Sequence, residues 1–221
     1  MRIRSLNVGL PRNVSFHGKS VKTSIFKSPV EGRRRVTRLN IEGDEQSDLT
    51  VHGGVDKAVY CYPSEHYDFW RRELPGVPLP WGAFGENLTT DGLLEGAAHV
   101  GDRLRAGSAE FVVTQPRLPC YKLGVRFDRP DILKTFLESR RIGFYLSVAV
   151  EGEVGAGDEI VLVSSDEERL GVMDVLELYL APEPDRELLR RASEHPSLPE
   201  SWRDHFRSQL EELDDDSGSA G

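Results

Sequence analysis

The densest set of reactive side chains lies in residues 114–122, TQPRLPCYK. Two prolines stiffen this segment after a predicted strand, and Arg117 and Lys122 flank Cys120. Nearby positive charge favours the thiolate, which is both a nucleophile and a soft metal ligand. The alternative is a small residue that packs in a turn, because free cysteines are frequently buried. Cys61 lies in an uncharged strand-like run, which predicts a core position.

A second segment with chemical potential is residues 51–57, VHGGVDK. Gly53 and Gly54 allow backbone amides to approach a ligand closely, and successive N–H groups can cradle an anion. His52 and Lys57 add two side-chain donors. The alternative is an ordinary Gly-Gly turn with solvated charges.

Two further candidates carry weaker signals. Asn87 lies in the glycine-rich segment 81–88, WGAFGENL, where its amide could bind a heterocycle or its own backbone. Lys27 lies on a predicted edge strand, where a lysine is usually solvated. The histidines show no HExxH spacing, and the sequence contains no GxGxxG motif and no P-loop.

The elements that must position these residues are mainly strands. Segments rich in β-branched or aromatic residues predict strands at 21–25, 35–41, 58–62, 110–114, 144–150 and 159–163. Gly-Asp pairs at 101–102 and 157–158 each precede a strand, which is the turn chemistry of a barrel. Two helices are predicted within this part, from Ser64 to about Leu74 and from Pro130 onward.

The composition changes after residue 163. Amphipathic helices are predicted at 172–180, 185–193 and 201–213, separated by proline-containing turns. We therefore expect a β-barrel domain over residues 1–165, a small helical domain over 168–213, and a disordered tail at 214–221.

The 221 residues carry a net charge of −9 that is unevenly distributed. Residues 164–221 hold 16 acidic and 6 basic residues, while the preceding part is close to neutral. This acidity argues against general binding of nucleic-acid polymers by the C-terminal part. No apolar run has the length of a membrane span or a signal peptide, so we expect a cytoplasmic protein with no membrane partner.

The ordered set of motifs resembles the MOSC-domain family of the YiiM type, the bacterial 6-N-hydroxylaminopurine resistance group. The resemblance runs from about residue 20 to 163, and the C-terminal helices resemble the small domain appended in that group. The motifs that carry it are Gly43-Asp44-Glu45-Gln46, His52-Gly53-Gly54, Asp56-Lys57-Ala58, Glu65-His66-Tyr67 with Trp70, residues 82–88, Gly101-Asp102, and Gln115-Pro116-Arg117 with Pro119-Cys120.

This resemblance implies a fold similar to the barrel domain of pyruvate kinase, with a molybdenum cofactor (a pterin dithiolene that carries Mo). It implies that Cys120 donates a thiolate to Mo and is the catalytic residue. It also implies reduction of N-hydroxylated bases such as 6-N-hydroxylaminopurine to the amine, with a flavoprotein reductase as electron donor. A homodimer is expected by the same analogy. The candidates to bind the pterin and its phosphate are Arg117, Lys122, Lys27, His52, Gly53, Gly54, Lys57 and Asn87.

Three alternatives remain open at this point. The chain could carry the molybdenum cofactor without catalysing a reaction. It could transfer sulfur through a persulfide on Cys120, because MOSC domains also occur attached to cofactor sulfurases. It could also be an interaction module whose acidic helical tail is the contact surface.

Overall fold

The computed structural model describes residues 1–47 and 53–218, and its core is an eight-stranded sheet. The sheet order is β12-β8-β9-β10-β6-β7-β1-β4, and each neighbouring pair is antiparallel except β6 and β7. Two small sheets, β5 with β11 and β2 with β3, accompany it. The strands are β1 (Arg2–Val8), β2 (Arg12–Phe16), β3 (Lys19–Thr23), β4 (Ser28–Pro29), β5 (Arg33–Val36), β6 (Val59–Pro63), β7 (Leu88–Asp91), β8 (Arg103–Ala106), β9 (Ala109–Pro116), β10 (Phe144–Val150), β11 (Gly152–Gly155) and β12 (Ile160–Ser164).

Backbone contacts between β1 and the start of β12 close the sheet into a barrel. Arg2 and Glu159 form an antiparallel bridge, and the Ile160 N–H donates to the Met1 carbonyl at 2.8 Å. The interior is filled by fully buried aliphatic and aromatic side chains, including Ile3 and Phe144. A closed sheet leaves few unpaired edges, which removes a route to aggregation. The predicted mainly-β class with a small helical addition is confirmed.

Helices cover one end of the barrel and pack over a second, aromatic core. They are α1 (Tyr67–Glu73), α2 (Tyr121–Phe127) and α3 (Ile132–Glu138), with the short 3₁₀ turns η1 (Val55–Lys57), η2 (Ser64–His66) and η3 (Glu95–Ala97). Trp70 stacks on Phe136 with ring centroids 5.4 Å apart, and its Nε1 donates to the Tyr62 hydroxyl at 2.6 Å. Helices were expected near α1 and α3, whereas α2, which begins directly after Cys120, was not.

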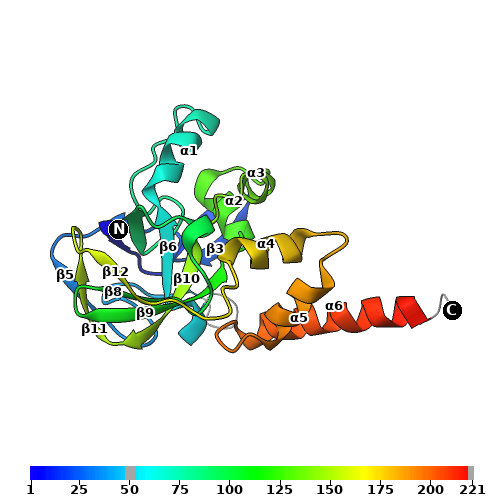
Figure 1. Ribbon diagram of the computed structural model, residues 1–221. Coiled ribbons are helices and arrows are strands. Elements are labelled where there is room, and N and C mark those ends of the chain that lie inside the picture. The colour runs from blue at the N-terminus through cyan, green and yellow to red at the C-terminus, as the bar shows by residue number, and fades with distance from the viewer. Residues whose placement is uncertain (48–52, 219–221) are drawn as a thin grey trace.

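The C-terminal region forms α4 (Val172–Leu180), α5 (Arg186–Glu194) and α6 (Glu200–Gly218). Figure 1 shows α5 and α6 side by side, with the last turns of α6 projecting away from the barrel. Asp185 caps α5 through the Leu188 N–H at 2.8 Å. Residues 214–218 extend α6 instead of forming the expected disordered tail. Arg186 accounts for part of this extension, because its guanidinium donates to the Leu213 carbonyl and pairs with Asp214.

One predicted strand is shorter than expected. The strand predicted at 35–41 ends at Val36, where β5 ends. The Thr37 N–H and hydroxyl donate to the Asn40 carbonyl and so close a turn. This local side-chain bond competes with continued strand pairing, as is common for Thr and Asn.

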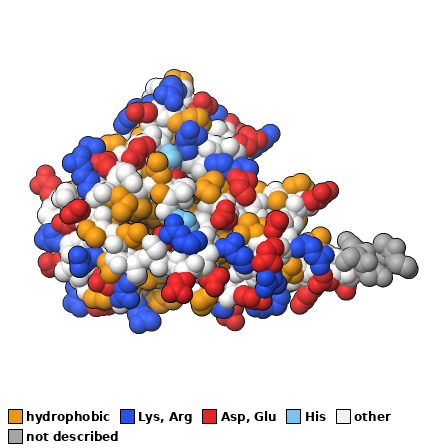
Figure 2. Space-filling model, in the orientation of Figure 1, with side chains coloured by type: hydrophobic (Ala, Val, Ile, Leu, Met, Phe, Trp, Pro, Cys, Tyr) orange, Lys and Arg blue, Asp and Glu red, His pale blue; other side chains and the backbone are white. Residues whose placement is uncertain are grey.

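The surface mixes charges of both signs. On the face in Figure 2, basic and acidic side chains are interspersed, with hydrophobic side chains in small groups between them. None of the described helices has the length and apolar character needed to cross a membrane.

Candidate functional site

Two tyrosines on adjacent strands line the candidate site, and a glutamine on the next strand lies beside them. Tyr145 of β10 is the register partner of Tyr60 of β6 and of Gln115 of β9. Register partners in antiparallel strands point to the same face, so the three side chains lie side by side. The two tyrosine rings are 5.3 Å apart. Burial raises the pKa of both phenols while nearby Arg117 opposes the shift, so both hydroxyls stay neutral, and that of Tyr60 donates to the Ile142 carbonyl at 2.7 Å.

Arg117 begins the loop that follows β9 and lies almost fully inside the protein. Its Cζ is 5.1 Å from the ring centroids of both Tyr60 and Phe136, and its backbone N–H donates to the Gly143 carbonyl at 3.2 Å. Within the described residues, its buried Nη1 has no hydrogen-bond partner. A buried donor without a partner is costly in a folded protein, so this atom marks a binding position.

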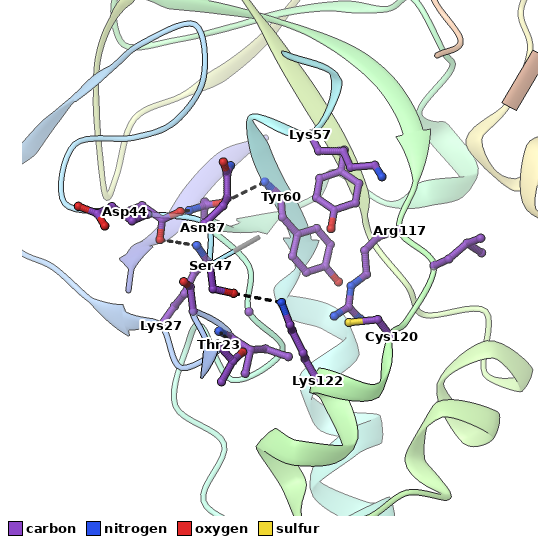
Figure 3. Close-up of a pocket in the computed structure, with 17 residues that line it drawn as sticks. Thr23, Lys27, Asp44, Ser47, Lys57, Tyr60, Asn87, Arg117, Cys120 and Lys122 are labelled. Carbon is purple, nitrogen blue, oxygen red and sulfur yellow. Dashed lines mark hydrogen bonds and ion pairs between the residues drawn. The ribbon is translucent and has the colours of Figure 1, made fainter. Parts of the chain in front are cut away.

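Cys120 ends the same loop at the start of α2 and is half-buried. Its sulfur lies beside the Arg117 guanidinium, as Figure 3 shows. Both side chains line one cavity. Cys61 differs, because it is fully buried in the barrel core and burial raises its pKa to about 12. The predicted core position of Cys61 is confirmed.

Three lysines approach this cavity from different elements. Lys122 of α2 donates to the Ser47 hydroxyl at 3.0 Å. Lys57 of η1 is half-buried, and burial lowers its pKa while Asp56 opposes the shift. Lys27, from the segment before β4, forms a buried ion pair with Asp44. Burial also lowers the pKa of Lys27, and the Asp44 carboxylate opposes this.

Asp44 organises the wall opposite Cys120. It is 2% exposed and accepts hydrogen bonds from the Gly9 N–H at 2.8 Å and from Asn87 Nδ2 at 2.9 Å. Asn87 in turn accepts from the Tyr60 N–H at 3.1 Å. These bonds use both ends of the Asn87 amide to join Asp44 to β6. The charge of Lys27 is therefore balanced inside the protein before any ligand is considered.

The cavity combines cations, hydroxyls, aromatic rings and one thiol. Ser24 Oγ is buried and, like Arg117 Nη1, has no partner among the described residues. The full lining is Thr23, Ser24, Ile25, Lys27, Asp44, Glu45, Gln46, Ser47, Lys57, Tyr60, Gly85, Asn87, Arg117, Leu118, Cys120, Lys122 and Tyr145. Such a lining suits a ligand with an anionic end and a flat ring system.

Six of the predicted site residues come together in this cavity: Cys120, Arg117, Lys122, Lys57, Asn87 and Lys27. Within the described part of the chain, neither Gly53 nor Gly54 belongs to its lining, and a Cβ on Gly54 would meet open space. The prediction for His52 falls outside the described residues. A binding role for the two glycines and His52 therefore remains a prediction from the sequence.

No site role was predicted for Asp44, Ser24, Tyr60 or Tyr145. Asp44 was named only within the family motif Gly43-Asp44-Glu45-Gln46. A buried carboxylate needs a cation, and Lys27 is 17 positions away in the chain, so no local pattern links them. From the sequence alone, Tyr60 and Tyr145 are ordinary strand residues. That their side chains lie on the same face of the sheet follows only from the register of β6 and β10.

A barrel whose cavity contains a thiol defines the class of protein. Comparison with known protein families identifies this class, because the MOSC domain family matches residues 48–161. The chain belongs to this family. A second family, the YiiM-like 3-alpha helix domain, matches residues 172–213. Together the two matches make the chain a YiiM-type MOSC protein.

Individual relatives agree with this assignment. The chain is 37% identical to the uncharacterized protein YflK of Bacillus subtilis, over 96% of this chain and 95% of that protein. It is 44% identical to protein YiiM of Escherichia coli over 64% of each chain. It is also 31% identical to a protein named reductase from Gibberella moniliformis, over 81% of this chain but 32% of that protein.

The fold also matches a solved structure over nearly its whole length. The crystal structure of YiiM from Geobacillus stearothermophilus superposes with a TM-score of 0.80 and 34% identity. The match covers 95% of this chain and 98% of that one. The helical domain is therefore part of the shared architecture.

Proposed function

We propose that this chain is a molybdenum-cofactor-dependent reductase that converts N-hydroxylated compounds to amines, with N-hydroxylated purine bases as the substrate class. The biological role that follows is detoxification of base analogues. One observation carries the proposal: the Cys120 thiol lies beside the buried Arg117 guanidinium in a cavity that three lysines also line. A thiolate is a soft metal ligand, and the cations suit the phosphate of a pterin cofactor.

The side chains present fit this cofactor. Arg117 Nη1 and Ser24 Oγ are buried polar atoms that lack partners among the residues that the structure describes, and a phosphate or a polar pterin edge would satisfy both. Lys122 lines the same cavity and can bind the phosphate, whereas Lys27 is already paired with Asp44. Tyr60 and Tyr145 offer aromatic rings to the pterin, and Tyr145 also offers a neutral hydroxyl, whereas the Tyr60 hydroxyl already donates to the Ile142 carbonyl at 2.7 Å. Cys120 supplies the thiolate.

The proposed reaction is R–NH–OH + 2 e⁻ + 2 H⁺ → R–NH₂ + H₂O. The bound cofactor supplies the two-electron redox chemistry, and an external flavoprotein reductase is the proposed electron source. The protein must hold the substrate and deliver protons. Lys57 is suited to proton delivery because burial lowers its pKa and because it lies on the Cys120 side of the cavity.

A turnover assay tests this proposal. The wild type, loaded with cofactor and kept under anaerobic conditions, is mixed with 6-N-hydroxylaminopurine and a chemically reduced viologen dye. Adenine formation is then followed by chromatography. We expect turnover by the wild type and by the control Cys61→Ser, and only the rate of cofactor-free protein for Cys120→Ser.

The two main alternatives give different results in the same preparations. A cofactor carrier would retain molybdenum and reduce no N-hydroxylated compound. A sulfur-transfer protein would form a persulfide on Cys120 without any need for molybdenum, and mass spectrometry of the intact protein would detect the added sulfur. Either result would refute the reductase proposal.

A further inference from the structure

A second cavity adjoins the first at Cys120 and lies between the barrel and the helical domain. The barrel contributes Gln115, Pro116 and Pro119, and the helical domain contributes Tyr179 of α4 together with Trp202 and His205 of α6. Four residues line both cavities: Lys57, Leu118, Cys120 and Tyr145. A ligand in the second cavity would therefore lie next to the same thiol.

The wall formed by the helical domain is aromatic. The Tyr179 ring is 5.3 Å from the Trp202 ring and 5.4 Å from the His205 ring, measured between centroids. Tyr179 is 40% exposed and His205 is also exposed, so their faces are accessible. Trp202 is nearly buried and fixed, because its Nε1 donates to Gln115 Oε1 at 2.6 Å. Gln115 also donates to the Asp56 carbonyl, which ties this wall to η1 and its Lys57.

The two cavities differ in chemistry in a way that assigns an occupant to each. The first cavity holds three lysines, Arg117 and two polar atoms with no partner in the described part of the chain, so it suits the anionic cofactor. The second presents a fixed indole, two accessible rings and the single lysine that both cavities share. Aromatic side chains bind planar bases by stacking, whichever base is present.

We propose that the second cavity is the substrate site, and that Tyr179, Trp202 and His205 select planar aromatic heterocycles and present their N–OH group toward the Cys120 side. This inference rests on the proposed reductase function for the chemistry and goes beyond it in giving the helical domain a role. The barrel binds the cofactor and shares the second cavity, while α4 and α6 determine which substrates stack there. Lys57 lies where the two ligands would meet.

The test uses exposed rings so that the fold is preserved. The variants are Tyr179→Ala and His205→Ala in the full cofactor-loaded chain, with Tyr121→Ala as control. Tyr121 is 55% exposed and adjacent to Cys120 in sequence, but it lines neither cavity. Steady-state kinetics compare 6-N-hydroxylaminopurine with hydroxylamine, which has no ring, and molybdenum content is measured for every preparation.

We expect each cavity variant to raise KM for the purine about tenfold, the loss typical of one stacking contact. The kcat, the KM for hydroxylamine and the molybdenum content should stay as in the wild type, and Tyr121→Ala should change none of these values. Equal rises in KM for both substrates, or unchanged KM for the purine, would overturn the assignment.

Calorimetric titration with adenine separates this inference from the reductase proposal. If the wild type binds adenine and the two variants bind it about tenfold more weakly, the cavity assignment stands even where no N-hydroxylated compound is reduced. If the wild type shows no saturable adenine binding, or the variants bind as tightly as the wild type, the second cavity is not a heterocycle site.

Discussion

Replacing Lys27 with methionine should lower the free energy of unfolding by about 3 kcal/mol. The side chains of Lys27 and Asp44 are only 8% and 1% exposed, so the substitution leaves a buried carboxylate without its cation. Removal of one partner of such a pair typically costs about 3–5 kcal/mol. Asp44 keeps its bonds from the Gly9 N–H and from Asn87, which places the expected loss at the lower end of that range.

A double-mutant cycle measured by urea denaturation of the cofactor-free protein tests this reasoning. Lys27→Met is combined with Asp44→Asn, and the double variant should recover at least 1 kcal/mol relative to the sum of the single losses. Lys134→Met is the matched control, because its pair with Glu138 is exposed and worth less than about 0.5 kcal/mol. A loss below 1 kcal/mol for Lys27→Met, or a coupling energy near zero, would refute the account of the buried pair.

Three further predictions concern the thiols, acid stability and one glycine. At pH 8 a disulfide reagent should modify Cys120 in the folded protein and reach Cys61 only after denaturation, since burial raises the pKa of Cys61 to about 12; rapid reaction of two thiols in the native state would contradict this. Burial tends to raise the pKa of Asp91, but hydrogen bonds from two β1 arginines and a serine outweigh it and hold the pKa below 3.8. Its stabilising contribution is full above pH 3.8 and is lost as the pH falls toward the lower pKa of the folded state, so Asp91→Asn should cost about 1 kcal/mol or less at pH 7 and clearly less near pH 2 in parallel urea titrations. A deficit as large at pH 2 as at pH 7 would argue against the ionic contribution. Gly143→Ala should destabilise the fold by more than about 2 kcal/mol, because φ is +65° and the new Cβ would lie 2.4 Å from the Cys61 carbonyl oxygen. Near-native stability in thermal unfolding would contradict this prediction and show that the backbone at Gly143 can relax.

Local patterns predict the strands and the reactive loop well. The strand expected at 144–150 coincides with β10, because its aromatic and β-branched residues fit a half-buried pleated surface. The loop with Arg117, Cys120 and Lys122 was identified from residue types alone, and all three line the cavity. Here the relevant information lies within nine consecutive residues.

Features that depend on distant contacts were beyond local reasoning. The strand β1 was not predicted, although it closes the barrel through its pairing with β7 and its bridge to Glu159. Asp44 became recognisable as a structural centre only when its partners were in place. The second cavity depends on a contact between the two domains. Trp202 of the helical domain donates to Gln115 of the barrel, which is 87 positions away in the sequence. Such contacts follow from packing and register, which a local pattern does not encode.

The central claim is that Cys120 binds molybdenum in this cavity, and metal content tests it most directly. Wild type, Cys120→Ser and the control Cys61→Ser are purified without oxygen from a host that makes the cofactor, and molybdenum is measured by mass spectrometry. The account predicts close to one Mo per chain in the wild type and in Cys61→Ser, and a large loss in Cys120→Ser. Molybdenum absent from repeated wild-type preparations, or retained in full by Cys120→Ser, would contradict it.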